Sequence, residues 1–96
     1  MTRNYEVAFL LKEGEVAKQA AERIKDYLSK VSAVVTKEGD LGTRQLAYVI
    51  HRNREDFHKA FYYILQVDID TDAILKFERQ LKFDEDIIRY MILSGK

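Results

Sequence analysis

The first dozen residues alternate between apolar and polar side chains. Four large apolar residues share one side of this extended segment, which predicts a strand with one buried face: Tyr5, Val7, Phe9 and Leu11. From residue 16 the apolar spacing lengthens to three or four positions, and charged residues fill the positions between. This pattern predicts an amphipathic helix of about four turns. Its buried stripe is expected to contain Val16, Ala20, Ile24, Tyr27, Leu28 and Val31.

The next segment reads as one long, interrupted strand. Residues 32–38 are rich in β-branched side chains, and Gly39 and Gly42 then interrupt the pattern. Two glycines three positions apart inside a strand pattern indicate a bulge or a sharp bend rather than two separate elements. Alternation then resumes, with one face expected to contain Leu46, Tyr48 and Ile50.

A hairpin is predicted at the polar stretch 51–56, which has the length and composition of a loop between two strands. Residues 61–69 after it form the clearest alternating strand of the chain. The stretch around Phe61 and Tyr63 partly resembles an RNA-binding motif in which strand aromatics stack on bases. Both residues share a face with Leu65, so we expect them in the core instead.

A second helix follows, with Asp70 or Thr71 as its N-terminal cap. Its buried stripe is expected to contain Ala73, Ile74, Phe77 and Leu81. Three consecutive carboxylates at 84–86 end the helix and are expected to lie in solvent, and residues 87–93 form the last strand.

The order strand, helix, strand, strand, helix, strand predicts an α+β fold. Right-handed crossovers place both helices on one face of a four-stranded antiparallel sheet, in the ferredoxin-like split βαβ arrangement (βαββαβ). The chain is short enough to form one domain, residues 1–96. The other face of the sheet is left open, and a partner would be expected to bind there.

Composition narrows the possible functions. The chain has 96 residues, 16 basic and 16 acidic, and no cysteine, so disulfides, thiolate metal sites and cysteine nucleophiles are excluded. The apolar run 7–11 is too short for a secretory signal or a membrane span, so we expect a cytoplasmic protein with no membrane partner.

No residue pattern predicts catalysis, a metal or another cofactor. The acidic run 68–72 resembles a calcium loop, but Ala73 and Arg79 occupy the positions that need glycine and glutamate. His51 and His58 are too few for a zinc site, and the serines and glycines form neither a nucleophile elbow nor a phosphate loop. We therefore predict neither an enzyme nor a small-molecule substrate.

Basic residues gather around the predicted hairpin, where only Glu55 and Asp56 oppose them: Arg44, Arg52, Arg54 and Lys59, with His51 and His58. Arginine presents a planar fork of donors that suits phosphate, so this group is a candidate RNA contact. A solvated loop would show the same composition, and the sequence leaves both possibilities open.

Residues 42–50, Gly-Thr-Arg-Gln-Leu-Ala-Tyr-Val-Ile, resemble the bacterial small-subunit ribosomal protein six family. Further similarity lies at residues 3–7, 58–60, 66–68 and 88–91, so the resemblance covers nearly the whole chain. Two positions depart from the family pattern. Thr43 replaces a frequent second basic residue, which weakens the expected phosphate contact there. Val49 replaces a frequent proline, which should leave the strand intact or improve its hydrogen bonding.

The resemblance implies a structural constituent of the small ribosomal subunit. It implies binding to the central domain of small-subunit ribosomal RNA, together with small-subunit ribosomal protein eighteen. The RNA-binding residues expected on this basis are Arg3, Arg44, Arg52, Arg54, Lys59 and Arg89. Two alternatives remain on the same fold. One is a dimerisation or ligand-sensing module without RNA binding. The other is an acylphosphatase-like enzyme, which the acidic segment 12–15 at the first strand–helix turn disfavours.

Overall fold

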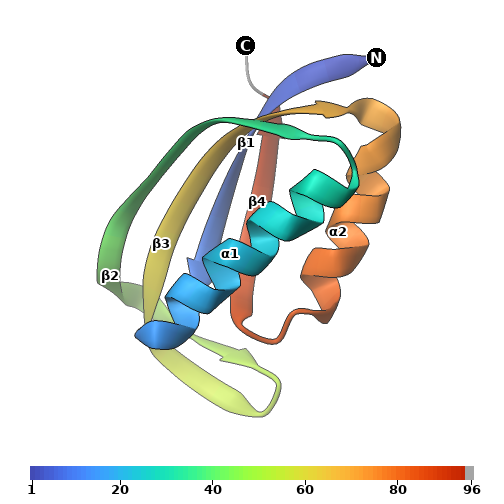
Figure 1. Ribbon diagram of the computed structural model, residues 1–96. Helices are drawn as coiled ribbons and strands as arrows, with labels where there is room; N and C mark the ends of the chain where they lie inside the picture. Colours follow the sequence, from blue (N-terminus) through green and yellow to red (C-terminus); the bar gives the residue numbers. More distant parts are fainter. Residues whose placement is uncertain (95–96) are drawn as a thin grey trace.

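The computed structural model describes residues 1–94 and contains the six elements in the expected order (Figure 1). Gly95 and Lys96, which the predicted domain also includes, lie outside the described residues. The 3-10 turn Thr71–Ala73 precedes the second helix. The strands and helices are β1 (Thr2–Leu11), α1 (Glu15–Lys30), β2 (Val34–Arg52), β3 (Glu55–Asp70), α2 (Ile74–Phe83) and β4 (Ile87–Ser94).

The four strands form one antiparallel sheet in the order β2-β3-β1-β4, and both helices cover the same face of it (Figure 1). Val7 of β1 pairs with Leu65 of β3 on one side and with Ile92 of β4 on the other. This topology confirms the predicted ferredoxin-like α+β fold. Neither helix in the described part of the chain is long and apolar enough to cross a membrane.

The main core lies between the helices and the sheet, and it uses the apolar stripes that the sequence pattern predicts. Its buried residues are Val7, Phe9, Leu11, Ala17, Ala20, Ile24, Leu28, Tyr63, Leu65, Val67, Ile69, Phe77, Leu81 and Ile87. Ala17 joins the α1 stripe, whereas Val16, Tyr27 and Val31 are only partly buried. In the stripe of the second helix, Ala73 and Ile74 are also only partly buried. Asp70 caps the turn before α2 by accepting a hydrogen bond from the backbone N–H of Asp72 (2.9 Å).

Tyr63 is buried in this core, as expected, and cannot stack on a base. Its hydroxyl donates to the carboxylate of Glu38, which also pairs with Lys25 of α1 at 2.8 Å. Burial raises the pKa of Tyr63, and the hydrogen bond to Glu38 raises it further. These contacts link α1 to the edge of the sheet.

The prediction that the carboxylates at 84–86 all lie in solvent is wrong for Asp84, which is 7% exposed. Arg23 of α1 donates to both of its carboxylate oxygens, at 3.0 and 2.9 Å, and the Tyr27 hydroxyl donates at 2.8 Å. Burial alone would raise the pKa of Asp84, but the hydrogen bonds from Arg23 and Tyr27 outweigh it and lower the pKa. The group therefore fastens the turn after α2 to α1.

The bulge predicted near the two glycines is present. The β2–β3 register shifts between Asp40 and Gly42, and Gly42 has a φ of 72°, in the left-handed region that glycine adopts without steric cost. Residues 34–52 form a single long strand, as expected.

The β2–β3 register also shifts between Val35 and Lys37 and between Gln45 and Ile50, and the sequence pattern predicted neither of these shifts. Gln45 pairs with Lys59 and Ile50 pairs with Phe57, so the four residues 46–49 of β2 stand opposite a single residue of β3. The prediction that Tyr48 shares a face with Leu46 and Ile50 is wrong, because Tyr48 is 83% exposed in this bulge while the other two are partly buried.

The hairpin itself is confirmed, but its loop is shorter than the polar stretch 51–56. The turn consists of Asn53 and Arg54 only, with φ of 52° and 64°. His51 and Arg52 are part of the ladder and pair with Asp56 and Glu55.

A second, smaller apolar cluster holds the hairpin end against the sheet. It consists of buried Phe57, Ala60 and Ile88, packed against partly buried Leu10, Leu46 and Ile50. The hairpin thereby lies beside β4 and the carboxyl end of α2 (Figure 1).

Candidate nucleic-acid interface

Five of the six predicted RNA-binding residues lie along the hairpin half of the sheet, and two of them, Arg52 and Arg89, share a hollow. Arg44 pairs with Ala60, Arg52 and Arg54 lie at the turn, and Arg89 of β4 pairs with Leu10. Lys59 of β3 belongs to the same hairpin.

Arg3 lies apart from this group. It pairs with Ile69 near the start of β1, seven residues from Leu10, which pairs with Arg89. That separation corresponds to about 23 Å along the strand. The structure therefore does not place Arg3 in the same site.

Arg52 and Arg89 border one hollow of about 240 Å³, whose other lining residues are Ile50, His51, Ile88 and Tyr90. One amino group of Arg52 (Nη2) donates to the backbone carbonyl of Lys82 at 3.3 Å. Its Nε is buried and has no hydrogen-bond partner within residues 1–94. Among residues 1–94 no carboxylate lines this hollow, so two guanidinium groups make it a favourable place for an anion.

Ion pairs with carboxylates involve other basic side chains of the described part of the chain, namely Lys12, Lys18, Arg23 and Lys25. At the hairpin, the His51 ring contacts the carboxylate of Asp56 at 2.7 Å. None of the six predicted RNA-binding residues forms an ion pair within residues 1–94. Arg44 is oriented by a hydrogen bond from its Nε to the carbonyl of Leu41 (2.9 Å), and its charge stays unpaired. The candidate residues therefore keep their charges available for a ligand.

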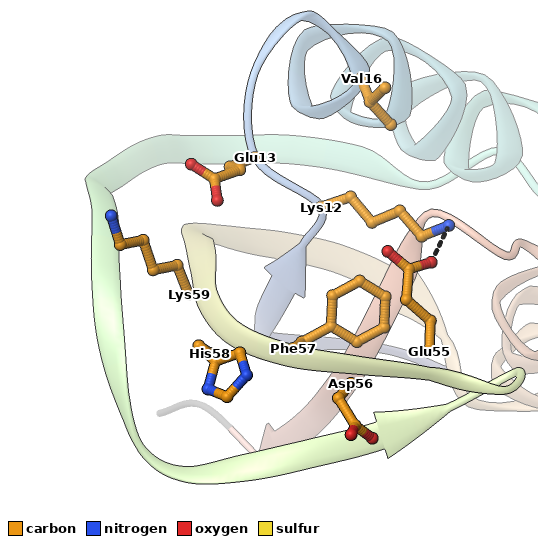
Figure 2. A pocket seen from close by; sticks show the side chains of 8 residues that line it. All are labelled: Lys12, Glu13, Val16, Glu55, Asp56, Phe57, His58 and Lys59. Atoms are coloured by element: carbon orange, nitrogen blue, oxygen red, sulfur yellow. Dashed lines mark ion pairs between the residues drawn. The ribbon is translucent and has the colours of Figure 1, made fainter.

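Another hollow, of about 440 Å³, lies between the start of α1 and the hairpin (Figure 2). Figure 2 shows Lys12 above the Phe57 ring, 5.7 Å from its centroid, and reaching Glu55 at 3.5 Å. Lys59 lies at the rim, and Glu13, Asp56 and His58 complete the polar lining. Acidic and basic groups alternate around this hollow, so it offers no net attraction for a polyanion.

The open face of the sheet carries an apolar hollow of about 210 Å³. It is lined by Ala8, Phe9, Leu10, Tyr62, Ile64, Arg89, Tyr90 and Met91. Met91 is 57% exposed. Arg89 and Tyr90 border both this hollow and the cationic one, so an apolar surface and a cationic surface meet at these two residues.

A family model described as ribosomal protein S6 matches residues 4–94 of the chain. The chain belongs to this family. Its members are structural ribosomal proteins of the small subunit rather than enzymes. Among solved structures, the chain is similar to the 30S ribosomal protein S6 from Thermotoga maritima, with a TM-score of 0.86 and 21% identity. The match covers 99% of this chain and 89% of that chain, and at this identity it supports the fold.

Within the ribosomal protein S6 fold, the segment 42–50 that carries the sequence resemblance lies in the irregular part of β2. Val49 belongs to the bulge 46–49 and has no Cα partner in β3. Valine leaves the strand intact, as predicted, because Val34–Arg52 is one continuous strand. It does not improve the pairing with β3, because Val49 has no partner there.

Sequence reasoning predicted that one face of the sheet is open, but it did not identify the apolar hollow on that face. The signal was present in the polar-side positions of β1 and β3, where Ala8, Leu10, Tyr62 and Ile64 interrupt the expected alternation. An exposed apolar surface of this kind is typical of a protein interface.

Proposed function

We propose that the chain binds the central domain of small-subunit ribosomal RNA together with small-subunit ribosomal protein eighteen, as a structural constituent of the small ribosomal subunit in the cytoplasm. The observation that carries the RNA contact is the hollow shared by Arg52 and Arg89, which no carboxylate in the described part of the chain lines. Membership of the ribosomal protein S6 family agrees with this function.

Binding would use charge and shape without any chemical step. Arg44, Arg52, Arg54, Lys59 and Arg89 would displace counterions from phosphates at the hairpin end, and the planar guanidinium groups would fix the orientation of the backbone. Arg3 would make a separate contact, because it lies about 23 Å from Arg89 along the sheet.

The protein partner would cover the apolar hollow on the open face, which contains Ile64 and Met91. Burying these side chains removes apolar surface from water and provides the driving force for association. Arg89 lies at the border, so RNA and the protein partner would meet there. A homodimer formed through the same apolar face, without RNA, is the alternative function.

The experiment mixes the chain with ribosomal protein eighteen and measures its affinity for a central-domain RNA fragment over a range of salt concentrations. Arg44→Ala and Arg89→Ala should each weaken binding and reduce the slope of log affinity against log salt by about one. Lys18→Gln is the matched control, because Lys18 is exposed on α1 but is paired with Glu15 at 3.6 Å.

Arg52 is less suitable for this test, because its bond to Lys82 also supports the fold. An unchanged slope in both the Arg44 and the Arg89 variants would contradict the proposed RNA surface. Dimerisation of the chain without any RNA affinity would favour the alternative.

A further inference from the structure

The outward face of α2 presents an exposed aromatic side chain among unpaired cations. Phe83, the last residue of the helix, is 85% exposed. Arg79 lies one turn earlier on the same side of the helix, and Lys82 is its neighbour in sequence. Both are exposed and neither forms an ion pair within residues 1–94.

This end of α2 adjoins the hairpin turn. Arg52 donates to the carbonyl of Lys82 at 3.3 Å, so the hairpin and the helix end are in contact. Arg54 lies two residues beyond Arg52 in the exposed turn. The cationic surface of the hairpin therefore continues directly onto α2, with Phe83 at the junction.

Most acidic side chains near this junction are held by partners within the fold. Asp84 is buried against Arg23, and Asp86 pairs with Arg23 at 2.7 Å. Glu78 is partly buried and accepts a hydrogen bond from the Tyr90 hydroxyl, which fixes its carboxylate but keeps its charge. Glu85 is the exposed carboxylate of this turn. The donation from Arg52 also offsets the partial negative charge at the carboxyl end of the helix.

We propose that Phe83 is a stacking platform for an unpaired base of the bound RNA, and that Arg79 and Lys82 hold the adjoining phosphates. This inference rests on the proposed function and extends the RNA surface from the hairpin onto α2. Proteins that read unpaired RNA place an aromatic ring against a base face and basic groups along the backbone, which is the arrangement found here. An acidic protein segment is the competing occupant. Contact with the hairpin cations favours RNA.

Phe83→Trp provides a direct test, because the chain contains no tryptophan. The variant should bind the central-domain RNA fragment, in the presence of ribosomal protein eighteen, as tightly as the wild-type chain. Stacking should quench the indole emission on addition of RNA and protect the indole from acrylamide. The same titration with the wild-type chain corrects for any emission from the partner.

Phe83→Leu keeps the apolar bulk and removes the aromatic face, so it should weaken RNA binding by at least about fivefold. Lys82→Gln and Arg79→Gln should each lower the salt slope by roughly one. Leu75→Ala is the matched control. Leu75 is 68% exposed on the same helix but lies two turns away from the hairpin, and its replacement should leave RNA binding unchanged.

Three outcomes would overturn the inference. Tight RNA binding with an unquenched indole would exclude stacking and leave the proposed function intact. A change in indole emission caused by ribosomal protein eighteen alone would assign the surface to a protein. Failure of the wild-type chain to bind RNA at all would refute the proposed function, and this inference with it.

Discussion

Arg54 holds a backbone conformation that side chains other than glycine rarely adopt. Together with Asn53 it forms a two-residue hairpin turn in which both φ values are positive, 52° and 64°. Such turns favour glycine at the second position, because a Cβ in the left-handed region costs about 1–2 kcal/mol. The arginine therefore lowers stability, while its charged side chain extends into solvent.

Arg54→Gly should raise the free energy of unfolding by about 0.5–1 kcal/mol, since the relief of strain exceeds the added flexibility of the unfolded chain. Urea denaturation measures this change. RNA affinity should fall in the same variant, because the proposed phosphate contact is lost. A less stable variant would show that the Arg54 side chain supports the hairpin.

The contact between Arg23 and the buried carboxylate of Asp84 is expected to stabilise the fold. Arg23→Ala should lower the free energy of unfolding by about 2–4 kcal/mol, because it leaves a buried carboxylate without its partner. The expected loss is below that of a fully buried pair, since the Arg23 side chain is 36% exposed. Tyr27→Phe, which removes one hydrogen bond, should cost about 1 kcal/mol in the same denaturation assay.

The same contact has a defined pH dependence. The pKa of Asp84 in the folded chain lies below its ordinary value of 3.8, because hydrogen bonds from Arg23 and Tyr27 outweigh burial. Ionised Asp84 therefore contributes its full share to the free energy of unfolding when the pH is above that ordinary value. This contribution is lost as the pH falls through the pKa of Asp84 in the folded chain. The stability difference between the wild-type chain and Arg23→Ala should narrow in acid. A difference that is constant down to pH 2 would contradict this assignment.

Among the elements, those with regular apolar spacing were predicted well and the irregular ones were not. The stripes of α1 and β3 follow directly from the sequence, because each packs one face against the same core. The hairpin loop was overestimated, because its paired polar residues lie in an exposed ribbon where alternation carries no apolar signal. Burial of Asp84 depends on Arg23, 61 positions away, which local patterns do not report.

In the candidate site, too, the sequence does not report which distant residues come together. Residue type and resemblance identified the basic positions, but only the paired strands reveal that Arg52 and Arg89 share a hollow and that Arg3 does not. The sequence pattern does not single out Phe83, because exposure of a single aromatic residue depends on how its helix packs.

The two glycines of β2 provide a test of its bulge. Gly42→Ala should lower the free energy of unfolding by about 1 kcal/mol, because Gly42 has a φ of 72° although the space around it is open. Gly39→Ala is the matched control, since its surroundings are equally open and its φ is not in the left-handed region. Equal effects of the two substitutions in thermal unfolding would argue against the bulge as the cause.

At the scale of the whole molecule, the positive and negative charges balance, but the ion pairs are unevenly distributed over the surface. Sixteen basic and 16 acidic residues cancel, yet the ion-paired lysines and arginines of residues 1–94 lie on α1 and just before it, whereas Arg52, Arg54 and Arg89 form no ion pair there. A neutral chain with a local cationic surface gains little from long-range attraction to RNA. We therefore expect its partner protein to contribute much of the affinity.

The isolated chain should bind the central-domain RNA fragment weakly, and ribosomal protein eighteen should increase the affinity. Filter binding or fluorescence anisotropy at two salt concentrations measures both effects. Ile64→Glu, which places a charge on the open apolar face, should abolish the increase without changing the weak binding of the chain alone. Tight, salt-insensitive binding by the isolated chain would contradict this expectation.

The small cluster formed by Phe57, Ala60 and Ile88 is separate from the larger core beneath the helices. The molecule therefore has two hydrophobic cores of different size. The smaller cluster has three buried members against 14 in the main core, so we expect it to open at a lower free energy than the helix-covered layer. Under the proposed function, we expect the hairpin tip to adjust its shape to the bound RNA while the helix-covered layer keeps its native conformation.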